Sequence, residues 1–600
     1  MSLKLKAKER LFWAIRQVVL PFGRIILLVD HRTIRIVSAC CSISELIDEG
    51  VDLVELISKR RQPMKNKVAL YLLSDDFASI NYLIEDFSAG HELYKSAFIM
   101  FNCHLSDDRA LRKIAEHVDV ERILACVELH LNFVAYEDRV FHGNMGFTLL
   151  SLYPTHSGKI VYSIASSLAS LCSTLGASPQ IRYHNCPSGL PQLVANSTEA
   201  LIKDTAVDDT RKTDDILLVV DRSFDAVPLH IHEYTYQAFV YDVMRIPCCT
   251  DPLAQRSDDV WEFEYVANSG KREKREALLS CEKDVLWQRF RHMHIQKVNE
   301  LVSEEVEKFA GHAAVGAHHQ ANTTRDILHA VRELPKTQYM VEKYWAHVAL
   351  TERSFEQIEN IHLVKIGELE QSLATNADRS GNKLSRTKAL QQLKTLLGDV
   401  EITCEVKMRL IFLYVAVYRN VNETHINELI DIASLSMNDV NIVHHFVELG
   451  LGPAAVEHVG SASPRSAALS GKITHKNNEK GDAYVYYKKH AEGGEYELSR
   501  FMPEIRHIIG RILAGTLDEQ RFPSLSTASS QTPLRGRTPI KPKGRVIIYV
   551  LGGITFSEMR IMYDMASRTG ADVYLGGDSI IVPSGLIEDM RHAFSAVEKT

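Results

Sequence analysis

The chain has 600 residues, of which 45% are hydrophobic and 24% are charged, and its formal net charge is −7. These values are ordinary for folded globular proteins of roughly two to four domains, and they exclude collagen-like, disordered and small disulfide-bonded classes. The slight acidic excess also argues against a predominantly basic nucleic-acid-binding protein. Ten cysteines without a CxxC spacing indicate a reduced, cytoplasmic protein.

The N-terminal region begins with an amphipathic helical pattern and then alternates between short apolar runs and helical patterns. The apolar runs cover residues 24–29, 68–73 and 97–101. Helical patterns cover residues 44–49, 79–87 and 109–117. Strands that are apolar on both faces and separated by helices predict a parallel sheet covered on both sides. We therefore expect an α/β domain over residues 1–139, and no segment long and apolar enough to span a membrane.

A second α/β domain is predicted over residues 140–247 and 483–600. Its first part contains a helical pattern at 163–175 and a strand at 215–220 that leads into Asp221. Near the end of the chain a strand, the Gly552-Gly553 turn, a helix and another strand follow one another over residues 545–575. These last strands are too few for a sheet of their own. We expect them to complete the second sheet, which makes this domain discontinuous.

The residues between these two parts, 248–482, are predicted to form a helical domain. Helical patterns cover residues 284–309, 322–334, 338–373, 385–397, 405–418, 425–433 and 437–449. Stretches with the composition of loops cover residues 311–321, 460–482 and 521–543. The last of these is rich in Pro, Ser, Thr and basic residues, so we expect it to be flexible.

Motifs for catalysis are weak. The chain contains no GxGxxG, GxxxxGK[ST], GxSxG or HExxH motif. Gly552-Gly553 follows a strand and could bring backbone N–H groups close to a phosphate, but no lysine follows. Asp221 and Asp225 follow a buried strand, where α/β enzymes place catalytic groups. One functional interpretation is therefore an enzyme that acts on a phosphorylated or nucleotide substrate at Asp221 and Gly552-Gly553. We favour the structural interpretation, in which the two glycines form a tight turn and Arg222 forms a structural ion pair.

Histidines raise the question of a metal site. His230 and His232 have no identifiable third ligand. His292 and His294 would point about 200° apart on a helix and could not share one ion. We expect no metal site and no cofactor.

Five cations in nine residues are the more distinctive feature: Lys59, Arg60, Arg61, Lys65 and Lys67. Glu55 lies four residues before Lys59, which is the spacing of an ion pair at a helix end. The cluster is then either a solvated helix terminus or a docking patch for an acidic partner.

Four stretches in the same order resemble the SM proteins, the Sec/Munc-type syntaxin-binding regulators of membrane fusion. The second stretch, 221–225 with 232–238, resembles the family's DR-x-FD…HE-x-T-[FY]-Q-A signature, and its HE is most like the exocytic branch. The others resemble the first domain (35–41 and 59–63), the YxLSR[WF]xP segment (496–503) and the strand–GG–helix near the C-terminus (550–560).

The resemblance implies an arch of three domains with two parallel-sheet α/β domains, the second discontinuous, and an inserted helical domain. It further implies no enzymatic activity and a cavity that holds a syntaxin-type SNARE and the assembled SNARE bundle. The partner-binding residues that it implies in this cavity are Asp30, Ile34, Arg35, Glu55, Lys59, Arg60 and Arg61. A second pocket, for the N-terminal peptide of syntaxin, would include Leu111 and Glu128.

The resemblance also implies that Pro335, ahead of a helix at the cavity mouth, is the switch for accepting a second SNARE. We therefore expect a monomeric regulator of vesicle docking and exocytosis that binds neither nucleic acid nor lipid directly. It would be cytoplasmic and reach plasma or secretory-vesicle membranes only through SNAREs. A helical scaffold without a SNARE role is the third interpretation.

Overall fold

The computed structural model describes residues 2–88, 92–105, 108–143, 158–205, 214–248, 259–266, 272–313, 338–418, 421–451, 496, 498–525 and 544–597. The chain divides into two compact units. The first unit contains residues 1–221, 507–554 and 562–579. The second contains residues 222–506, 555–561 and 580–600. Expected features at residues 314–334, Pro335 and residues 460–482 lie outside the described residues, and the expected domain boundaries at residues 139, 247 and 482 stay a prediction.

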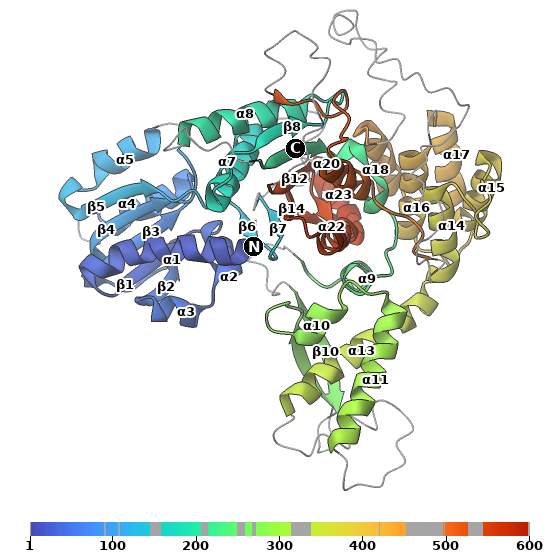
Figure 1. Cartoon of the computed structure of the whole chain (residues 1–600), viewed down its shortest axis with the longest axis horizontal. Helices are drawn as coiled ribbons and strands as arrows, with labels where there is room; N and C mark the ends of the chain where they lie inside the picture. Colours follow the sequence, from blue (N-terminus) through green and yellow to red (C-terminus); the bar gives the residue numbers. More distant parts are fainter. Residues whose placement is uncertain are drawn as a thin grey trace, which may run out of the picture. The chain divides into compact units, whose positions relative to one another are not determined.

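A five-stranded parallel sheet with the order β2-β1-β3-β4-β5 organises the N-terminal part of the first unit (Figure 1). Its strands are β1 (Ile25–Val29), β2 (Val51–Leu56), β3 (Met64–Leu73), β4 (Tyr94–Phe101) and β5 (Ile123–Glu128). The helices are α1 (Leu3–Phe22), α2 (Thr33–Cys40), α3 (Ile43–Asp48), α4 (Phe77–Asp86) and α5 (Arg109–His117). All five residues of β1 are buried, because separate hydrophobic clusters cover its two faces. The predicted parallel sheet is confirmed.

Strand β2 corrects the helical placement of the basic cluster. Glu55 lies on β2, opposite Leu28 of β1, and not one helical turn before Lys59. The β-branched residues Val51 and Val54 favour a strand because their side chains pack well on a pleated surface. Lys59 and Arg60 therefore lie in the turn after this strand.

A six-stranded sheet forms the second α/β domain and combines strands from both ends of the chain. The strand order is β6-β7-β14-β12-β9-β8, and only β6 and β7 are antiparallel. The strands are β6 (Val134–Ala135), β7 (Val140–His142), β8 (Gln180–Tyr183), β9 (Ile216–Asp221), β12 (Val546–Leu551) and β14 (Val573–Gly577). Helices α7 (Gly158–Leu175), α8 (Leu190–Thr205) and α22 (Phe556–Thr569) connect them. Since β12 pairs with β9, the predicted discontinuous domain is confirmed.

The start of the expected flexible loop at residue 521 is wrong. The backbone N–H of Tyr183 donates to the carbonyl of Pro523 at 3.2 Å, and the N–H of Asn185 donates to that of Arg521 at 2.8 Å. Phe522 is buried and its ring packs on His184. These apolar and backbone contacts fix residues 521–525 beside β8, while residues 526–543 lie outside the described part of the chain.

The second unit is mainly helical, as predicted. Its helices are α9 (Tyr236–Val243), α10 (Val285–Phe290), α11 (Ile295–Ala313), α13 (Gln338–Asn360), α14 (Leu363–Thr375), α15 (Arg386–Leu397), α16 (Cys404–Val417), α17 (Glu423–Ala433) and α18 (Met437–Glu448). The C-terminal helix α23 (Pro583–Val597) also belongs to this unit, whereas helix α20 (Ile505–Ala514) belongs to the first unit from residue 507 onward. The antiparallel hairpin of β10 (Val260–Val266) and β11 (Arg272–Leu278) was not expected. Its stacked rings of Trp261 and Phe263 alternate with exposed glutamates, which is strand periodicity.

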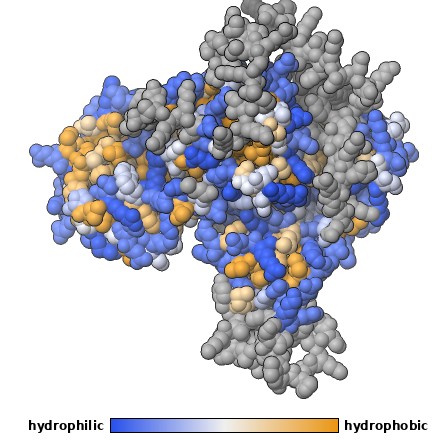
Figure 2. Space-filling model, in the orientation of Figure 1, coloured by the Kyte–Doolittle hydropathy of each residue, from blue (hydrophilic) through white to orange (hydrophobic). Residues whose placement is uncertain are grey.

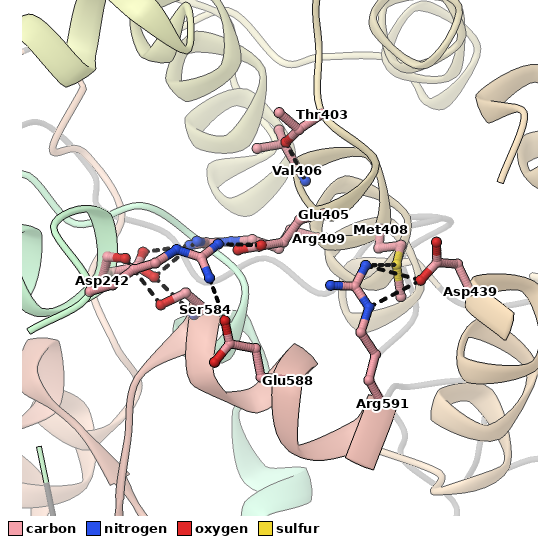
Figure 3. Close-up of polar contacts among 11 residues, drawn as sticks. Asp242, Thr403, Glu405, Val406, Met408, Arg409, Asp439, Ser584, Glu588 and Arg591 are labelled. Carbon is pink, nitrogen blue, oxygen red and sulfur yellow. Dashed lines mark hydrogen bonds and ion pairs between the residues drawn. The ribbon is translucent and has the colours of Figure 1, made fainter. Parts of the chain in front are cut away.

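Ion pairs attach α23 to the helices of this unit (Figure 3). The buried Arg409 of α16 donates to both oxygens of Asp242 at 3.1 and 2.9 Å, and the N–H of Ser584 donates to the same carboxylate at 2.9 Å. Arg245, which is half-exposed, bridges Glu405 and Glu588. Asp242 is thus the common anchor for the inserted helices and the C-terminal helix.

Replacing Arg409 by Met should destabilise the protein by about 3–5 kcal/mol, because the Asp242 carboxylate would remain buried without its guanidinium. The matched change Arg245→Met removes a half-exposed arginine and should cost less than about 1 kcal/mol. Urea unfolding of both variants measures the difference. Equal losses of unfolding free energy would contradict the buried anchor.

Candidate partner-binding surface

Asp30 organises the carboxyl end of the first sheet from inside the protein. It follows β1 and is only 2% exposed. Its carboxylate accepts hydrogen bonds from the N–H of Arg32 and Thr33 at 2.9 and 2.8 Å, and from the N–H and hydroxyl of Ser74 at 2.6 and 2.7 Å. These bonds join the start of α2 to the end of β3. Asp30 therefore holds α2 in place, and α2 presents the half-buried Ile34 and Arg35.

The basic turn after β2 divides into exposed and buried cations. Lys59 and Arg60 are exposed, whereas the side chain of Arg61 is only 5% exposed. The guanidinium of Arg61 donates to both carboxylate oxygens of Asp86, at 2.7 and 2.8 Å. A surface partner would therefore meet Lys59 and Arg60, while Arg61 serves the interior. The sequence could not separate these roles, because Asp86 lies 25 residues further along the chain.

Leu111 and Glu128 lie at the other edge of the same sheet. Leu111 is 40% exposed on α5, and Glu128 ends the edge strand β5. Glu128 accepts hydrogen bonds from the backbone N–H of Leu105 at 3.0 Å and from the ring of His104 at 2.9 Å. Figure 2 shows hydrophobic residues gathered at this end of the domain, and the exposed apolar side chains there include those of Val120, Leu124 and Val127.

In the DR-x-FD segment, Arg222, Phe224 and Asp225 lie in the second unit and are buried. The guanidinium of Arg222 has no exposed surface and donates to both oxygens of Glu558 at 3.0 and 2.6 Å. It also donates to the backbone carbonyl of Asp225. The Asp225 carboxylate accepts the N–H of Glu504 at 2.9 Å, and burial, partly opposed by Arg222, raises the pKa of Asp225 to about 7. The structural ion pair expected for Arg222 is present, with Glu558 as its partner.

Two other signature segments, 232–238 and 496–503, contact helix α14. The ring of His232 lies 2.7 Å from Glu370, whose carboxylate also accepts the N–H of His232 at 2.9 Å. The side-chain oxygen of Gln371 accepts the N–H groups of Arg500 and Phe501 at 2.8 and 2.7 Å. These segments therefore fasten separate parts of the chain to α14.

The backbone of the Gly552-Gly553 turn already has a partner inside the protein, the carboxylate of Asp578. The N–H of Gly552 donates to the buried carboxylate of Asp578 at 2.5 Å, and the hydroxyl of Tyr549 donates to its other oxygen at 2.6 Å. Burial raises the pKa of Asp578 to about 6. Asp221 is also buried and accepts a hydrogen bond from Ser188 at 2.9 Å. Both features proposed for a phosphate-binding enzyme thus have structural partners.

The histidines are likewise part of the packing. His230 lies against Phe412 and Phe446, and burial lowers its pKa. His292 and His294 lie between α10 and α11 and not on a helix. His294 stacks on Tyr496 at 3.7 Å between ring centroids, and burial lowers its pKa to about 4. In the described part of the chain, no three His, Cys, Asp or Glu side chains come together as metal ligands.

Among the helices described above, none combines the length and the hydropathy required to cross a bilayer.

Comparison with known families gives a match over almost the whole chain. Residues 25–589 match the Sec1 family. The chain belongs to the Sec1 family. It is 28% identical to protein transport protein sec1 of Dictyostelium discoideum, and the match covers 98% of both chains. It is 25% identical to the SNARE-interacting protein KEULE of Arabidopsis thaliana, over 94% of this chain and 91% of that protein.

Solved structures of SM proteins share the fold. The Unc18 of the Unc18–syntaxin 1 complex from Monosiga brevicollis matches with a TM-score of 0.78 and 22% identity, over 98% of this chain and 99% of that chain. The SM protein Vps45 in complex with the Qa SNARE Tlg2 matches with a TM-score of 0.72 and 20% identity, over 99% and 98% of the two chains. The predicted family and fold class are confirmed.

Asp578→Asn should remove a pH dependence of stability. The folded-state pKa of Asp578 is raised to about 6 from an ordinary value of 3.8, so its contribution to stability is present below about pH 4 and is lost as pH rises through 6. An asparagine can accept from Gly552 and donate to Tyr549, and it carries no charge. Relative to wild type, the variant should gain about 2–3 kcal/mol of unfolding free energy between pH 4 and pH 7.

Urea titrations at both pH values measure this difference. A constant difference between the variant and wild type across this range would show that Asp578 does not titrate in the folded protein as its burial requires.

Proposed function

We propose that this chain is an SM-type regulator of SNARE-mediated vesicle docking and fusion in exocytosis. It binds a syntaxin-like SNARE and controls or templates assembly of the SNARE complex. Membership of the Sec1 family over residues 25–589 supports the class of function, and relatives named as protein transport and SNARE-interacting proteins support the process. The observation that carries the binding site is the pair of exposed cations, Lys59 and Arg60, on the turn after β2.

The chemistry of this turn suits an acidic helical partner. Cations in water steer association with an acidic surface and fix its register, because complementary charges accelerate encounter and like charges are repelled. Ile34, Arg35 and Glu55 are half-buried and offer apolar, basic and acidic groups on neighbouring elements of the same domain. Asp30 and Arg61 support this surface from below and do not face the partner.

A second contact would use the edge of the sheet at β5. Leu111 and Glu128 supply an exposed apolar group and a carboxylate, which suit a peptide with a hydrophobic side chain and a positive amino terminus. The SM protein Sly1p has been solved in complex with an N-terminal peptide of Sed5p, at 14% identity and a TM-score of 0.67. We assign this edge to the N-terminal peptide of the syntaxin.

The proposed role is binding, without an enzymatic reaction, and it places the protein in the cytoplasm, attached to membranes through its SNARE partners. The internal partners of Asp221 and Gly552 support this choice over the phosphate-binding alternative. Pro335 remains the proposed switch for accepting a second SNARE.

Reversing Lys59 and Arg60 to Glu should weaken syntaxin binding at least tenfold, because two repulsive contacts would replace two attractive ones. The soluble part of each syntaxin-type SNARE of the source organism is titrated by calorimetry. The matched control reverses Lys383 and Lys388, two exposed cations of the helical unit, and should leave the affinity unchanged. Equal affinity of wild type and the Lys59/Arg60 variant would refute this contact surface.

Leu111→Glu should weaken binding of a syntaxin N-terminal peptide about tenfold or more, since it places a carboxylate where an apolar side chain would insert. His117→Glu, on another face of α5, is the control. Fluorescence anisotropy with a labelled peptide of the first residues of the syntaxin measures both affinities. If the two variants lose affinity equally, the peptide does not contact Leu111.

A further inference from the structure

The backbone of the basic turn is fastened by the side chain of Arg61. Its Nη2 donates to the carbonyl of Ile57 at 2.8 Å, and its Nε donates to the carbonyl of Lys59 at 3.1 Å. These two carbonyls lie on either side of Ser58. One guanidinium therefore closes the turn upon itself while two further hydrogen bonds join it to Asp86.

Asp86 is in turn fixed by the sheet. It is the last residue of α4 and is 4% exposed. One of its carboxylate oxygens accepts the hydroxyl of Tyr71 on β3 at 2.8 Å. The Tyr71 ring is buried against Phe87 and Tyr94, so the carboxylate has little freedom to move. The turn is thus connected through Arg61 to a rigid part of the core.

We propose that the Arg61–Asp86 pair is a clamp that positions Lys59 and Arg60 for the SNARE partner. The inference rests on the proposed function. Lysine and arginine side chains are long and lose much rotamer freedom on binding. A backbone that is already fixed lowers the conformational entropy cost of binding. Asp86 acts through Arg61 and is a positioning residue that touches no partner.

The geometry requires arginine at position 61. Arginine presents its donors in a planar fork, which here reaches one carboxylate and two carbonyl oxygens at once. Lysine carries a single ammonium group and cannot match all four contacts. Arg61→Lys should therefore loosen the turn while keeping the charge of the basic cluster unchanged.

The test separates positioning from simple stability. Removing one member of the pair would leave a buried charge and unfold part of the domain, so the informative variant combines Arg61→Met, Asp86→Leu and Tyr71→Phe. Apolar replacement of a buried ion pair is often neutral for stability. This triple variant should keep its melting temperature within a few degrees of wild type, and the carbonyls of Ile57 and Lys59 would lose their side-chain donor.

Two readouts are then compared with wild type. Hydrogen exchange of the Lys59 amide, which is bonded to the carbonyl of Leu56 at 3.1 Å, should accelerate at least tenfold. The affinity of the triple variant for the soluble part of the syntaxin, measured by calorimetry, should fall about tenfold. The affinity of Arg61→Lys should lie between those of wild type and the triple variant. Lys59→Ala with Arg60→Ala should lose affinity with no change in exchange at Ile57, because its clamp is intact.

The outcomes distinguish the two proposals. If the triple variant binds and exchanges as wild type does, the clamp is overturned even though Lys59 and Arg60 contact the partner. If its affinity falls only in proportion to a lowered melting temperature, Arg61 and Asp86 are merely structural and the clamp is again overturned. If the variant with Lys59→Ala and Arg60→Ala binds syntaxin normally, the proposed contact surface is refuted. If hydrogen exchange of the Lys59 amide is unchanged in the triple variant, the clamp is overturned whatever the affinity.

Discussion

The buried pair of Arg222 and Glu558 is the interaction on which the second unit depends. Both side chains have no exposed surface, so neither charge is stable there without the other. Arg222 also binds the carbonyl of Asp225, whose carboxylate receives the backbone of Glu504. One guanidinium therefore joins the segment that follows β9 to the start of α22, more than 300 residues further along the chain, and through Asp225 to the segment before α20. A lost partner would disturb all three segments together.

This constraint explains why the signature segments are recognisable in the sequence. In these segments Arg222 pairs with Glu558, His232 contacts Glu370, and the backbone of Phe501 donates to Gln371. A buried contact of this kind tolerates few substitutions. The residues that identify the family therefore hold the fold together. The proposed contact residues Lys59 and Arg60 are exposed, where many side chains would satisfy the same physical requirements. The resemblance thus rests on buried residues that hold the fold together and also on the stretch 59–63, which contains the exposed Lys59 and Arg60.

The sheets could be predicted because their strands are apolar on both faces, as in Ile25–Val29 and Val546–Leu551. The hairpin β10–β11 was missed because its charged face resembles a solvated helix, and β2 was missed because Glu55 and Lys59 have helical spacing. The candidate site was located by the basic cluster, yet the interior role of Arg61 depends on Asp86. That contact arises from packing of α4 against the sheet, which spacing along the chain does not encode.

Arginine residues have two different roles in this protein, and the burial of the side chain decides which role each one has. Arg61, Arg222 and Arg409 each face a carboxylate in the interior, where their forked geometry connects several acceptors. Arg60 lies in water, where an ion pair contributes little to stability and its charge remains available to a partner. Replacing the exposed cations should therefore leave the domain folded. The clamp ensures that any side chain at position 59 or 60 is presented from the same backbone position.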